Sequence, residues 1–444
     1  EMCDSDWSSD VCSSDLSEAD GISHGWIFTL DPCHSSVAIT RRNPGVHGRP
    51  VVLECKIRGR GLLVMRFLFA RHPALTLMFV VIALVGIEAA LQLRAQLTMG
   101  RSVFTQMLAE PTKVRDPELG FQTFRANARI GGANQVIETN ALGFRSPQLA
   151  GGDGEGVLRI AFVGASTVFG AYAPRNEALM SYRVAEGLRK LPGLEEVELF
   201  NAGLPGRTLA QQLTILKRRV LPWRPNIVVF YPGMIDVSAV CRQSAGDAED
   251  GKTGRAPRSG LQIPQPSLPV WLLAPELIRK NTLFLRPQTG GSAVGPAASP
   301  ADVPFDKLRR RVDALLAATR GAGATPVVVT LTRAFRPEQP QAVQQALSTS
   351  MRYYYDCFDL AGLNAIFSAY NAMLRAAADD AGALLVDLAK AVPGGRTHFA
   401  DATHFSAAGG ALAAETLLPV LRQLIRTQNF AKSPDTANRR SAEE

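Results

Sequence analysis

The chain has 444 residues, of which 46% are hydrophobic, 20% charged and 7% aromatic. This composition excludes a wholly disordered, a collagen-like and a disulfide-scaffold protein. The formal net charge is +8, but residues 1–64 hold 6 Lys or Arg against 9 Asp or Glu, and the remainder holds 42 against 31. Because no basic run is interleaved with aromatic residues, we expect no nucleic-acid partner.

The first 64 residues show no convincing amphipathic pattern. Residues 6–16 read DWSSDVCSSDL and, with the rest of the first 16 residues, resemble the translation of a sequencing adapter. Residues 17–64 are rich in turn formers. We therefore expect segment 1–64 to be disordered, non-native translation of upstream DNA, with Met65 as the start of the protein. A genuine N-terminal extension is the alternative.

Residues 65–94 are predicted to form an N-terminal membrane anchor. Residues 74–93 are twenty in number, about the thickness of the hydrocarbon core, and eleven of them are Leu, Ile, Val or Phe. Their favourable insertion energy outweighs the cost of Glu88. Arg66 and Arg71 before this run indicate a single-pass protein whose following domain is extracytoplasmic, in the periplasm or at the cell surface. A buried helix and a cleaved signal peptide are the alternatives.

From residue 156 to residue 426, short apolar runs alternate with helical patterns. The predicted strands are Leu158–Val163, Val197–Phe200, Ile227–Tyr231, Pro326–Leu331 and Ala383–Leu388. The predicted helices are Ala178–Leu191, Leu209–Val220, Phe305–Arg320, Leu363–Asp380 and Ala407–Ile425. The alternation predicts a three-layer α/β/α domain around a five-stranded parallel sheet. In such sheets ligands bind beyond the carboxyl ends of the strands.

Four segments fall outside this alternation. Residues 95–155 are expected to form an extracytoplasmic lead-in, and residues 427–444 a disordered tail. Residues 241–302 form an insertion rich in Gly, Pro, Ser and Ala, with a short helix expected near 270–281. Residues 333–360 are expected to be another long connection. Loops of this length are often binding loops, and a floppy insertion is the alternative.

Two cysteines lie outside the N-terminal segment, Cys241 and Cys357; the others are Cys3, Cys12, Cys33 and Cys55. In an oxidising compartment Cys241 and Cys357 could pair, and two unrelated cysteines are the alternative. No C-x-x-C, H-E-x-x-H or other metal-ligand spacing occurs in the sequence. We therefore expect no metal and no organic cofactor.

A serine follows the first predicted strand. The run Gly164-Ala165-Ser166-Thr167 places Ser166 at the predicted start of a helix, where backbone N–H groups and the helix dipole favour negative charge. That setting suits a serine nucleophile and its oxyanion, while a helix-capping serine is the alternative. Since Val168 replaces the second glycine of G-x-S-x-G and no G-K-[ST] follows, we expect neither a nucleophile elbow nor a P-loop.

A serine nucleophile needs a base, and the sequence leaves two histidines for that role. Of the six histidines, three lie in segment 1–64 and His72 borders the apolar run, so His398 and His404 remain. Asp401 lies three residues before His404, and on a tight turn this spacing brings carboxylate and imidazole together. The carboxylate would then orient the ring towards Ser166. The alternative is that Asp401 caps the final helix and His404 only packs.

Four short blocks resemble those of the SGNH, or GDSL, hydrolases, over roughly residues 156–426. In chain order they read GAST at 164–167, NAG at 201–203, GMID at 233–236, and DATH at 401–404 with SAAG at 406–409. The run NALGFR at 140–145 resembles a lead-in of membrane-anchored bacterial members.

The resemblance implies a flavodoxin-like SGNH fold and a Ser-His-Asp site. Ser166 would be the nucleophile, His404 the base and Asp401 its partner, with the N–H groups of Ser166 and Gly203 in the oxyanion hole. The third block departs from the pattern, because Ile235 stands where the family has a donor Asn. Losing one such donor typically costs about 10²–10³-fold in rate.

The function implied by the resemblance is that of a serine esterase. Its substrates would be acyl esters, acetyl esters among them, of surface carbohydrate or lipid. Its partners would be that substrate and the membrane, through residues 74–93. Two alternatives stay open: an O-acyltransferase acting on polysaccharide, and a catalytically impaired glycan-binding module at the cell surface, which the Ile235 departure favours.

Overall fold

A computed structural model describes residues 26–30, 36–41, 52–56, 73–99, 112–131, 135–149, 157–192, 194, 196–243, 272–275, 277 and 298–428. The chain divides into two compact units, Glu1–Leu91 and Gln92–Glu444. In the first unit, β1 (Trp26–Leu30), β2 (Ser36–Arg41) and β3 (Val52–Lys56) form an antiparallel sheet in that order. The structure thus has strands at places where the sequence predicts disorder. The non-native origin of segment 1–64 stays a prediction.

One long apolar helix, α3 (Pro73–Met99), includes the whole of the predicted span 74–93. Residues 73–97 are long and apolar enough to cross a membrane, and no residue of their most apolar 18-residue window is buried. In the part of the chain that the structure describes, this is the one helix with these properties. Its length and composition fit either a membrane span or a signal sequence.

The centre of the second unit is a five-stranded parallel sheet. Its strands are β8 (Val157–Gly164), β9 (Glu196–Gly203), β10 (Ile227–Tyr231), β11 (Thr325–Val329) and β12 (Leu384–Val386). They lie in the order β12-β11-β10-β8-β9 and overlap the five predicted strands. Numbered from the first strand, this is the flavodoxin-like order 2-1-3-4-5. The predicted fold class is therefore confirmed.

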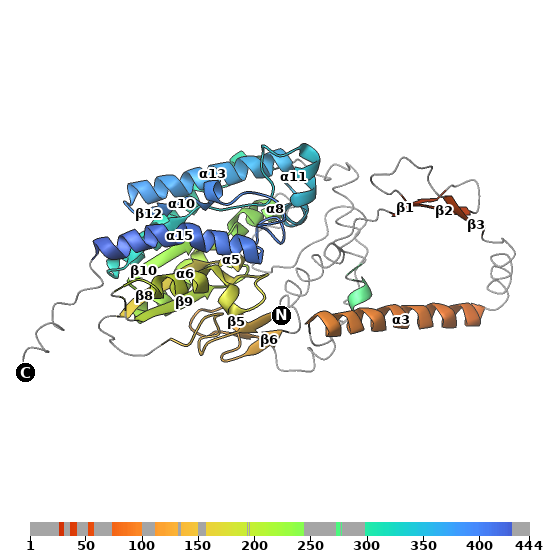
Figure 1. Ribbon diagram of the computed structural model, residues 1–444, viewed down its shortest axis with the longest axis horizontal. Helices are drawn as coiled ribbons and strands as arrows, with labels where there is room; N and C mark the ends of the chain where they lie inside the picture. Colours follow the sequence, from red (N-terminus) through yellow and green to blue (C-terminus); the bar gives the residue numbers. More distant parts are fainter. Residues whose placement is uncertain are drawn as a thin grey trace, which may run out of the picture. The chain divides into compact units, whose positions relative to one another are not determined.

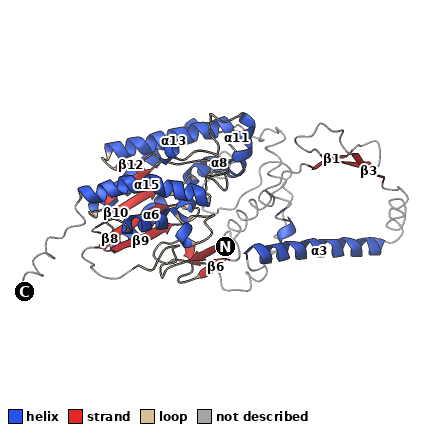
Figure 2. Cartoon of the chain, viewed as in Figure 1, coloured by secondary structure: helices blue, strands red, loops and turns tan. Residues whose placement is uncertain are grey.

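Helices cover both faces of this sheet (Figures 1 and 2). On one face, α6 (Met180–Arg189) packs against α15 (Ala407–Thr427). On the other face, α10 (Phe305–Gly321) packs against both α7 (Leu209–Ile215) and α13 (Leu360–Asp380). Shorter elements are α5 (Ser166–Phe169), α8 (Ser238–Gln243), α14 (Leu388–Ala391), η1 (Asn176–Ala178), η2 (Leu216–Val220), η3 (Leu221–Trp223), η4 (Ile235–Val237) and η5 (Pro300–Asp302).

The lead-in forms two small antiparallel sheets that belong to the second unit. One pairs β4 (Lys113–Arg115) with β5 (Gln122–Phe124), and the other pairs β6 (Arg129–Gly131) with β7 (Val136–Glu138). The lead-in is tied to the α/β domain by ion pairs from Arg219 in η2, which reach Asp116 at 2.7 Å and Glu118 at 2.5 Å. The lead-in is thus packed on the domain rather than only preceding it.

The long connection expected at 333–360 contains two helices, α11 (Gln341–Leu347) and α12 (Thr349–Tyr354). Just beyond α12, Cys357 forms a disulfide with Cys241 of α8. Of the insertion 241–302, the structure describes both ends and, near its middle, a helical stretch at 273–275, inside the helix expected at 270–281. The disorder expected after residue 427 falls almost wholly outside the described residues.

The strand order places a topological switch point between β8 and β10. At the carboxyl ends of the strands, Gly164 of β8 pairs with Gly203 of β9 on one side and with Tyr231 of β10 on the other. A Cβ on Gly164 would lie 2.2 Å from the carbonyl oxygen of Tyr231, so only glycine fits there. The loops that follow these three strands therefore start at one edge of the sheet, the edge where ligands bind in this class of fold.

Candidate active site

The structure brings together a hydroxyl, an imidazole and a carboxylate at the switch point. The Nε2 atom of His404 lies 2.7 Å from Oγ of Ser166, and Nδ1 of His404 lies 2.6 Å from Oδ2 of Asp401. The side chains of His404 and Asp401 are 15% and 14% exposed, so the group is enclosed yet reachable.

The chemistry of the three groups assigns the protons between them. A carboxylate can only accept hydrogen bonds, so Nδ1 of His404 carries the proton that it donates to Asp401. In a neutral imidazole, Nε2 then has a free lone pair and accepts the hydroxyl proton of Ser166. This is the arrangement in which a serine hydroxyl is ready to lose its proton to histidine.

A tight loop between β12 and α15 places Asp401 beside His404. The N–H groups of Thr403 and His404 both donate to Oδ1 of Asp401 at 2.8 Å, which turns the chain around the carboxylate. Burial alone raises the pKa of Asp401, but the charge of His404, its ring hydrogen bond and the two backbone hydrogen bonds lower it further, so the net pKa lies below its ordinary value. Asp401 is therefore held as an anion.

The start of α15 closes this loop. Ser406 caps the helix by accepting the N–H of Gly409 at 3.2 Å, and its own N–H donates to the carbonyl of His398 at 3.0 Å. A Cβ on Gly409 would lie 1.9 Å from that carbonyl oxygen, which explains glycine at this place in the fourth block. His398 itself serves to shape the loop through its backbone; of the two candidate histidines, only His404 contacts Ser166.

Ser166 begins a helix of a single turn. The helix α5 spans four residues and is followed by Gly170, whose φ of 73° lies in the left-handed region. The N–H groups of Gly170 and Ala171 both donate to the carbonyl of Ser166, at 2.9 and 3.2 Å. With so few aligned peptides, individual backbone N–H groups rather than a helix dipole are available to stabilise negative charge near Ser166.

The second block packs against α5 and is held by its own hydrogen bonds. Gly203 is buried, and its N–H donates to Oδ1 of Asn201 at 3.2 Å. A Cβ on Gly203 would lie 2.4 Å from the backbone nitrogen of Phe169, so the glycine is needed for close packing against α5. Asn201 also donates from Nδ2 to the carbonyl of Val168 at 3.0 Å. The second block therefore braces α5, and the N–H expected to serve an oxyanion already has an acceptor.

The third block supplies a buried acid rather than an amide donor. Ile235 is half-buried at the start of η4 and has no polar group to offer. Asp236 accepts the N–H of Leu209 at 2.8 Å and forms an ion pair with Arg311 of α10. Burial raises the pKa of Asp236, and the contacts with Leu209 and Arg311 offset this only in part. Asp236 thus joins the loop after β10 to the start of α7.

Sequence reasoning missed two contributors to the site. The ring of Tyr172, in the loop after α5, has its centroid 5.6 Å from that of the His404 ring. Arg145, part of the NALGFR run, is fully buried and binds the carbonyl oxygens of that same loop. The NALGFR run was a signal that the lead-in matters, but nothing in its letters shows which loop Arg145 reaches. Among the described residues, no group of three His, Cys, Asp or Glu side chains is placed to hold a metal ion.

A doubly wound α/β domain with a hydroxyl, an imidazole and a carboxylate in line at its switch point has the parts of a serine-type hydrolase. Comparison with protein families agrees, since residues 162–412 match the GDSL-like Lipase/Acylhydrolase family. The match spans more than half of the chain, and the chain belongs to this family of ester-hydrolysing enzymes. No curated protein matches it.

Solved structures of GDSL-type proteins resemble the chain over its α/β domain. A lipase/acylhydrolase from Enterococcus faecalis is 17% identical, with 60% of this chain and 96% of that chain covered and a TM-score of 0.34. An acetylxylan esterase from Geobacillus stearothermophilus is 15% identical, with coverages of 59% and 93% and a TM-score of 0.35. A GDSL-like lipase from Bacteroides thetaiotaomicron is 12% identical, with coverages of 61% and 88% and a TM-score of 0.33. Likeness at this level indicates neither a substrate nor a mechanism for this chain.

Proposed function

We propose that the chain is a serine esterase in which Ser166, His404 and Asp401 form the catalytic triad. The observation that carries this proposal is the 2.7 Å contact between Nε2 of His404 and Oγ of Ser166, with Asp401 on the opposite ring nitrogen. Ser166 attacks the carbonyl carbon of an acyl ester while His404 takes its proton. His404 then donates that proton to the oxygen of the leaving alcohol, which departs.

The second half of the reaction releases the acyl group. A water molecule loses a proton to His404 and attacks the carbonyl of the acyl-Ser166 ester. When this second tetrahedral intermediate collapses, His404 returns the proton to Oγ of Ser166 and a carboxylic acid leaves. Asp401 stabilises the imidazolium in both halves and keeps the ring in its productive tautomer.

The oxyanion in this proposal is bound mainly by backbone donors. The first is the N–H of Ser166, for which no acceptor is found among the described residues. The N–H of Gly203 would first have to release Asn201. Gly206, in the loop that follows β9, is exposed, has a φ of 69°, and its N–H also has no acceptor within the described part of the chain. We therefore propose the N–H of Gly206, beside that of Gly203, as a second donor to the oxyanion.

We further propose that the catalytic domain is exported and anchored by α3, with the anchor at residues 65–94, the lead-in at 95–155 and the hydrolase domain at 156–426. The disulfide between Cys241 and Cys357 supports this, because such bonds persist in oxidising compartments and are rare in the cytosol. Fusion of alkaline phosphatase to the C-terminus in a bacterial host should give an active phosphatase, and fusion of green fluorescent protein should give dark cells. Fluorescent cells with an inactive phosphatase would contradict export.

The substrate class in this proposal is the acyl ester of surface carbohydrate or lipid. The test is release of acetate from acetylated xylan and from p-nitrophenyl acetate by the full chain and by its Ser166→Ala and His404→Ala variants. We expect both variants to lose at least about 10³-fold in kcat. Transfer of acetyl to an added oligosaccharide faster than to water would identify an acyltransferase. Binding of glycan without release of acetate would identify a binding module.

A further inference from the structure

The loop that follows α5 is held from the lead-in at almost every residue. Of the five carbonyl oxygens in its segment 170–174, four accept hydrogen bonds from the lead-in. Arg145 reaches the carbonyls of Gly170 at 2.6 Å and Ala173 at 3.0 Å. The side chain of Gln135 donates to the carbonyls of Ala171 and Ala173, at 2.6 and 3.0 Å. The N–H of Val136 donates to the carbonyl of Pro174 at 2.8 Å.

Arg145 is an unusual residue to find at such a place. Its side chain is 0% exposed, and its five hydrogen bonds go to Asn176 and to the carbonyls of Phe169, Gly170, Ala173 and Val136. None of these acceptors is a carboxylate. Burial lowers the pKa of Arg145 to about 10, so it is still a cation at neutral pH. The charge of Glu177 raises this pKa only in part, and burying a cation is costly, so the planar fork of donors has to contribute something that a smaller apolar residue would not.

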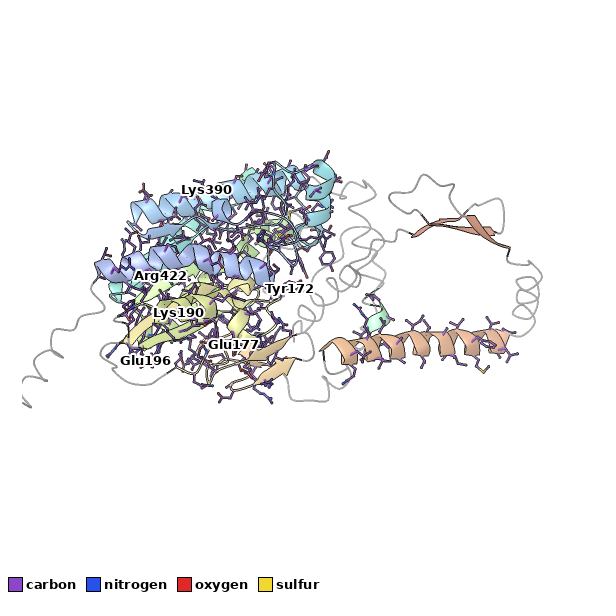
Figure 3. All side chains as sticks on the ribbon, viewed as in Figure 1. Tyr172, Glu177, Lys190, Glu196, Lys390 and Arg422 are labelled. Carbon is purple, nitrogen blue, oxygen red and sulfur yellow. A yellow bond between two sulfur atoms is a disulfide. The ribbon has the colours of Figure 1, made fainter. Side chains whose placement is uncertain are left out.

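The hydrogen bonds from Arg145, Gln135 and Val136 to this loop are called the clamp below. The clamp holds the loop that carries Tyr172. The side chain of Tyr172 lies beside His404, with ring centroids 5.6 Å apart and planes tilted by 54°. Figure 3 labels Tyr172 at the end of the domain where α5 and the start of α15 lie. Tyr172 as a whole is half-buried.

The position of Tyr172 defines which part of a substrate it would meet. In ester hydrolysis the imidazole donates its proton to the oxygen of the leaving alcohol, so the alcohol group has to lie against His404. A side chain in contact with the His404 ring is therefore next to the alcohol and not to the acyl chain. A tyrosine there presents a flat apolar ring with a polar tip, a surface that suits ring-shaped alcohols with apolar faces and hydroxyl edges, as in sugars.

Building on the proposed esterase function, we propose that Tyr172 forms the alcohol-side wall of the substrate site and that Arg145 is the positioning residue that holds it there. Tyr172 selects for esters whose alcohol is a ring over esters of a small alkyl alcohol. The lead-in is thus part of the catalytic unit, because it fixes a residue that contacts the substrate.

The test compares two esters with the same acetyl group, p-nitrophenyl acetate with a ring alcohol and methyl acetate with a minimal one. In the full chain, Tyr172→Ala should raise KM for p-nitrophenyl acetate about tenfold, which is the size of an aromatic contact, and should change KM for methyl acetate by less than about twofold. Tyr172→Phe keeps the ring and should stay close to wild type. An unchanged KM for both esters, or equal losses with both, would overturn the assignment of Tyr172.

The positioning role of Arg145 is tested with Arg145→Lys, which keeps the charge but loses the fork, and with Gln135→Ala, which loosens the same loop more mildly. Both variants should raise KM for p-nitrophenyl acetate but not for methyl acetate, as is expected of Tyr172→Ala. In both, kcat should change by a smaller factor than KM. The matched control is Arg159→Lys, because Arg159 is also buried but pairs with Glu198 on the sheet. A folded Arg145→Lys or Gln135→Ala protein with wild-type KM for p-nitrophenyl acetate would contradict the clamp.

The same experiments distinguish an error about Tyr172 from an error about the esterase function. If the wild-type chain hydrolyses neither ester and its serine is not labelled by a fluorophosphonate, the esterase proposal fails and the role of Tyr172 falls with it. If the wild-type chain is labelled and active while Tyr172→Ala keeps the wild-type preference between the two esters, the esterase proposal stands and the alcohol-side wall is wrong.

Discussion

The hydroxyl of Ser166 and the Nε2 atom of His404 are 2.7 Å apart although 238 positions separate them in the chain. Two separate local structures make this contact. Ser166 follows the strand β8 at the switch point of the sheet, and His404 is carried by the loop that Asp401 and Gly409 shape before α15. Because both local structures end at the same edge of the sheet, a contact between distant residues needs no unusual strain.

Replacing the carboxylate of the proposed triad tests whether it sets the tautomer of His404. Asp401→Asn keeps the shape of the side chain but presents an amide to Nδ1, so the proton is no longer held there. We expect kcat to fall about 10⁴-fold with little change in KM, measured with p-nitrophenyl acetate.

The matched control for that variant is Asp387→Asn. Asp387 is also an enclosed carboxylate, bound by Thr330 at 2.9 Å and by Arg375 at 3.0 Å, but it is not hydrogen-bonded to the Ser166–His404 pair. Its loss should lower the free energy of unfolding by about 1–3 kcal/mol and leave kcat within a few-fold of wild type. Equal losses of kcat in both variants would mean that Asp401 acts only through folding.

Replacing Ile235 of the third block by an amide residue should increase activity. Ile235 stands where an amide donor would strengthen oxyanion binding, so Ile235→Asn should raise kcat by up to about 10²-fold without a matching change in KM. Ile235→Leu controls for altered packing and should not increase activity. A lower or unchanged kcat in Ile235→Asn, with the protein folded, would show that the side chain at 235 does not face the oxyanion.

The disulfide predicts a stability that depends on the redox state. Cys241 and Cys357 are 116 positions apart, and closing a loop of that length typically stabilises a protein by about 2–5 kcal/mol. The Cys241→Ala/Cys357→Ala double variant should therefore unfold at a lower urea concentration than wild type, and dithiothreitol should shift only the wild-type midpoint. A wild-type midpoint unaffected by reductant would contradict a structural disulfide.

Acid should destabilise the domain in a defined pH range. Burial raises the pKa of Asp116 and of Asp387, but hydrogen bonds from Arg219 and Arg375, among other contacts, lower it more, so both values lie below the ordinary 3.8, as that of Asp401 does. A native pKa below the unfolded one means that the stabilisation is complete above 3.8 and is lost as the pH falls through the native values.

Urea unfolding between pH 7 and pH 2 measures this effect. The free energy of unfolding should be nearly constant down to about pH 5 and then fall, as linkage requires. Asp387→Asn should show a shallower fall because one of the contributing carboxylates is gone. Asp236, whose pKa is raised by burial, opposes the trend and does not reverse it. A free energy that rises or stays flat below pH 4 would contradict the ion-pair assignments.

The strands and the three triad candidates were predictable because their signals are local. Each strand is a short apolar run, and Ser166, Asp401 and His404 follow such runs at the carboxyl edge. The occupied N–H of Gly203 was not predictable, because it depends on where the side chain of Asn201 points in the folded sheet. The ring contact between Tyr172 and His404 was not predictable either, since the loop of Tyr172 is bound by Arg145, in a different part of the chain.

The central claim is that Ser166 is activated by His404, and covalent labelling tests it most directly. Wild-type protein, Ser166→Ala and His404→Ala are treated with a fluorophosphonate probe, and the labelled peptide is identified by mass spectrometry. The account predicts a single label on Ser166 in the wild type, none in Ser166→Ala and strongly slowed labelling in His404→Ala. A folded wild-type protein that stays unlabelled, or a Ser166→Ala variant labelled as fast as the wild type, would contradict it.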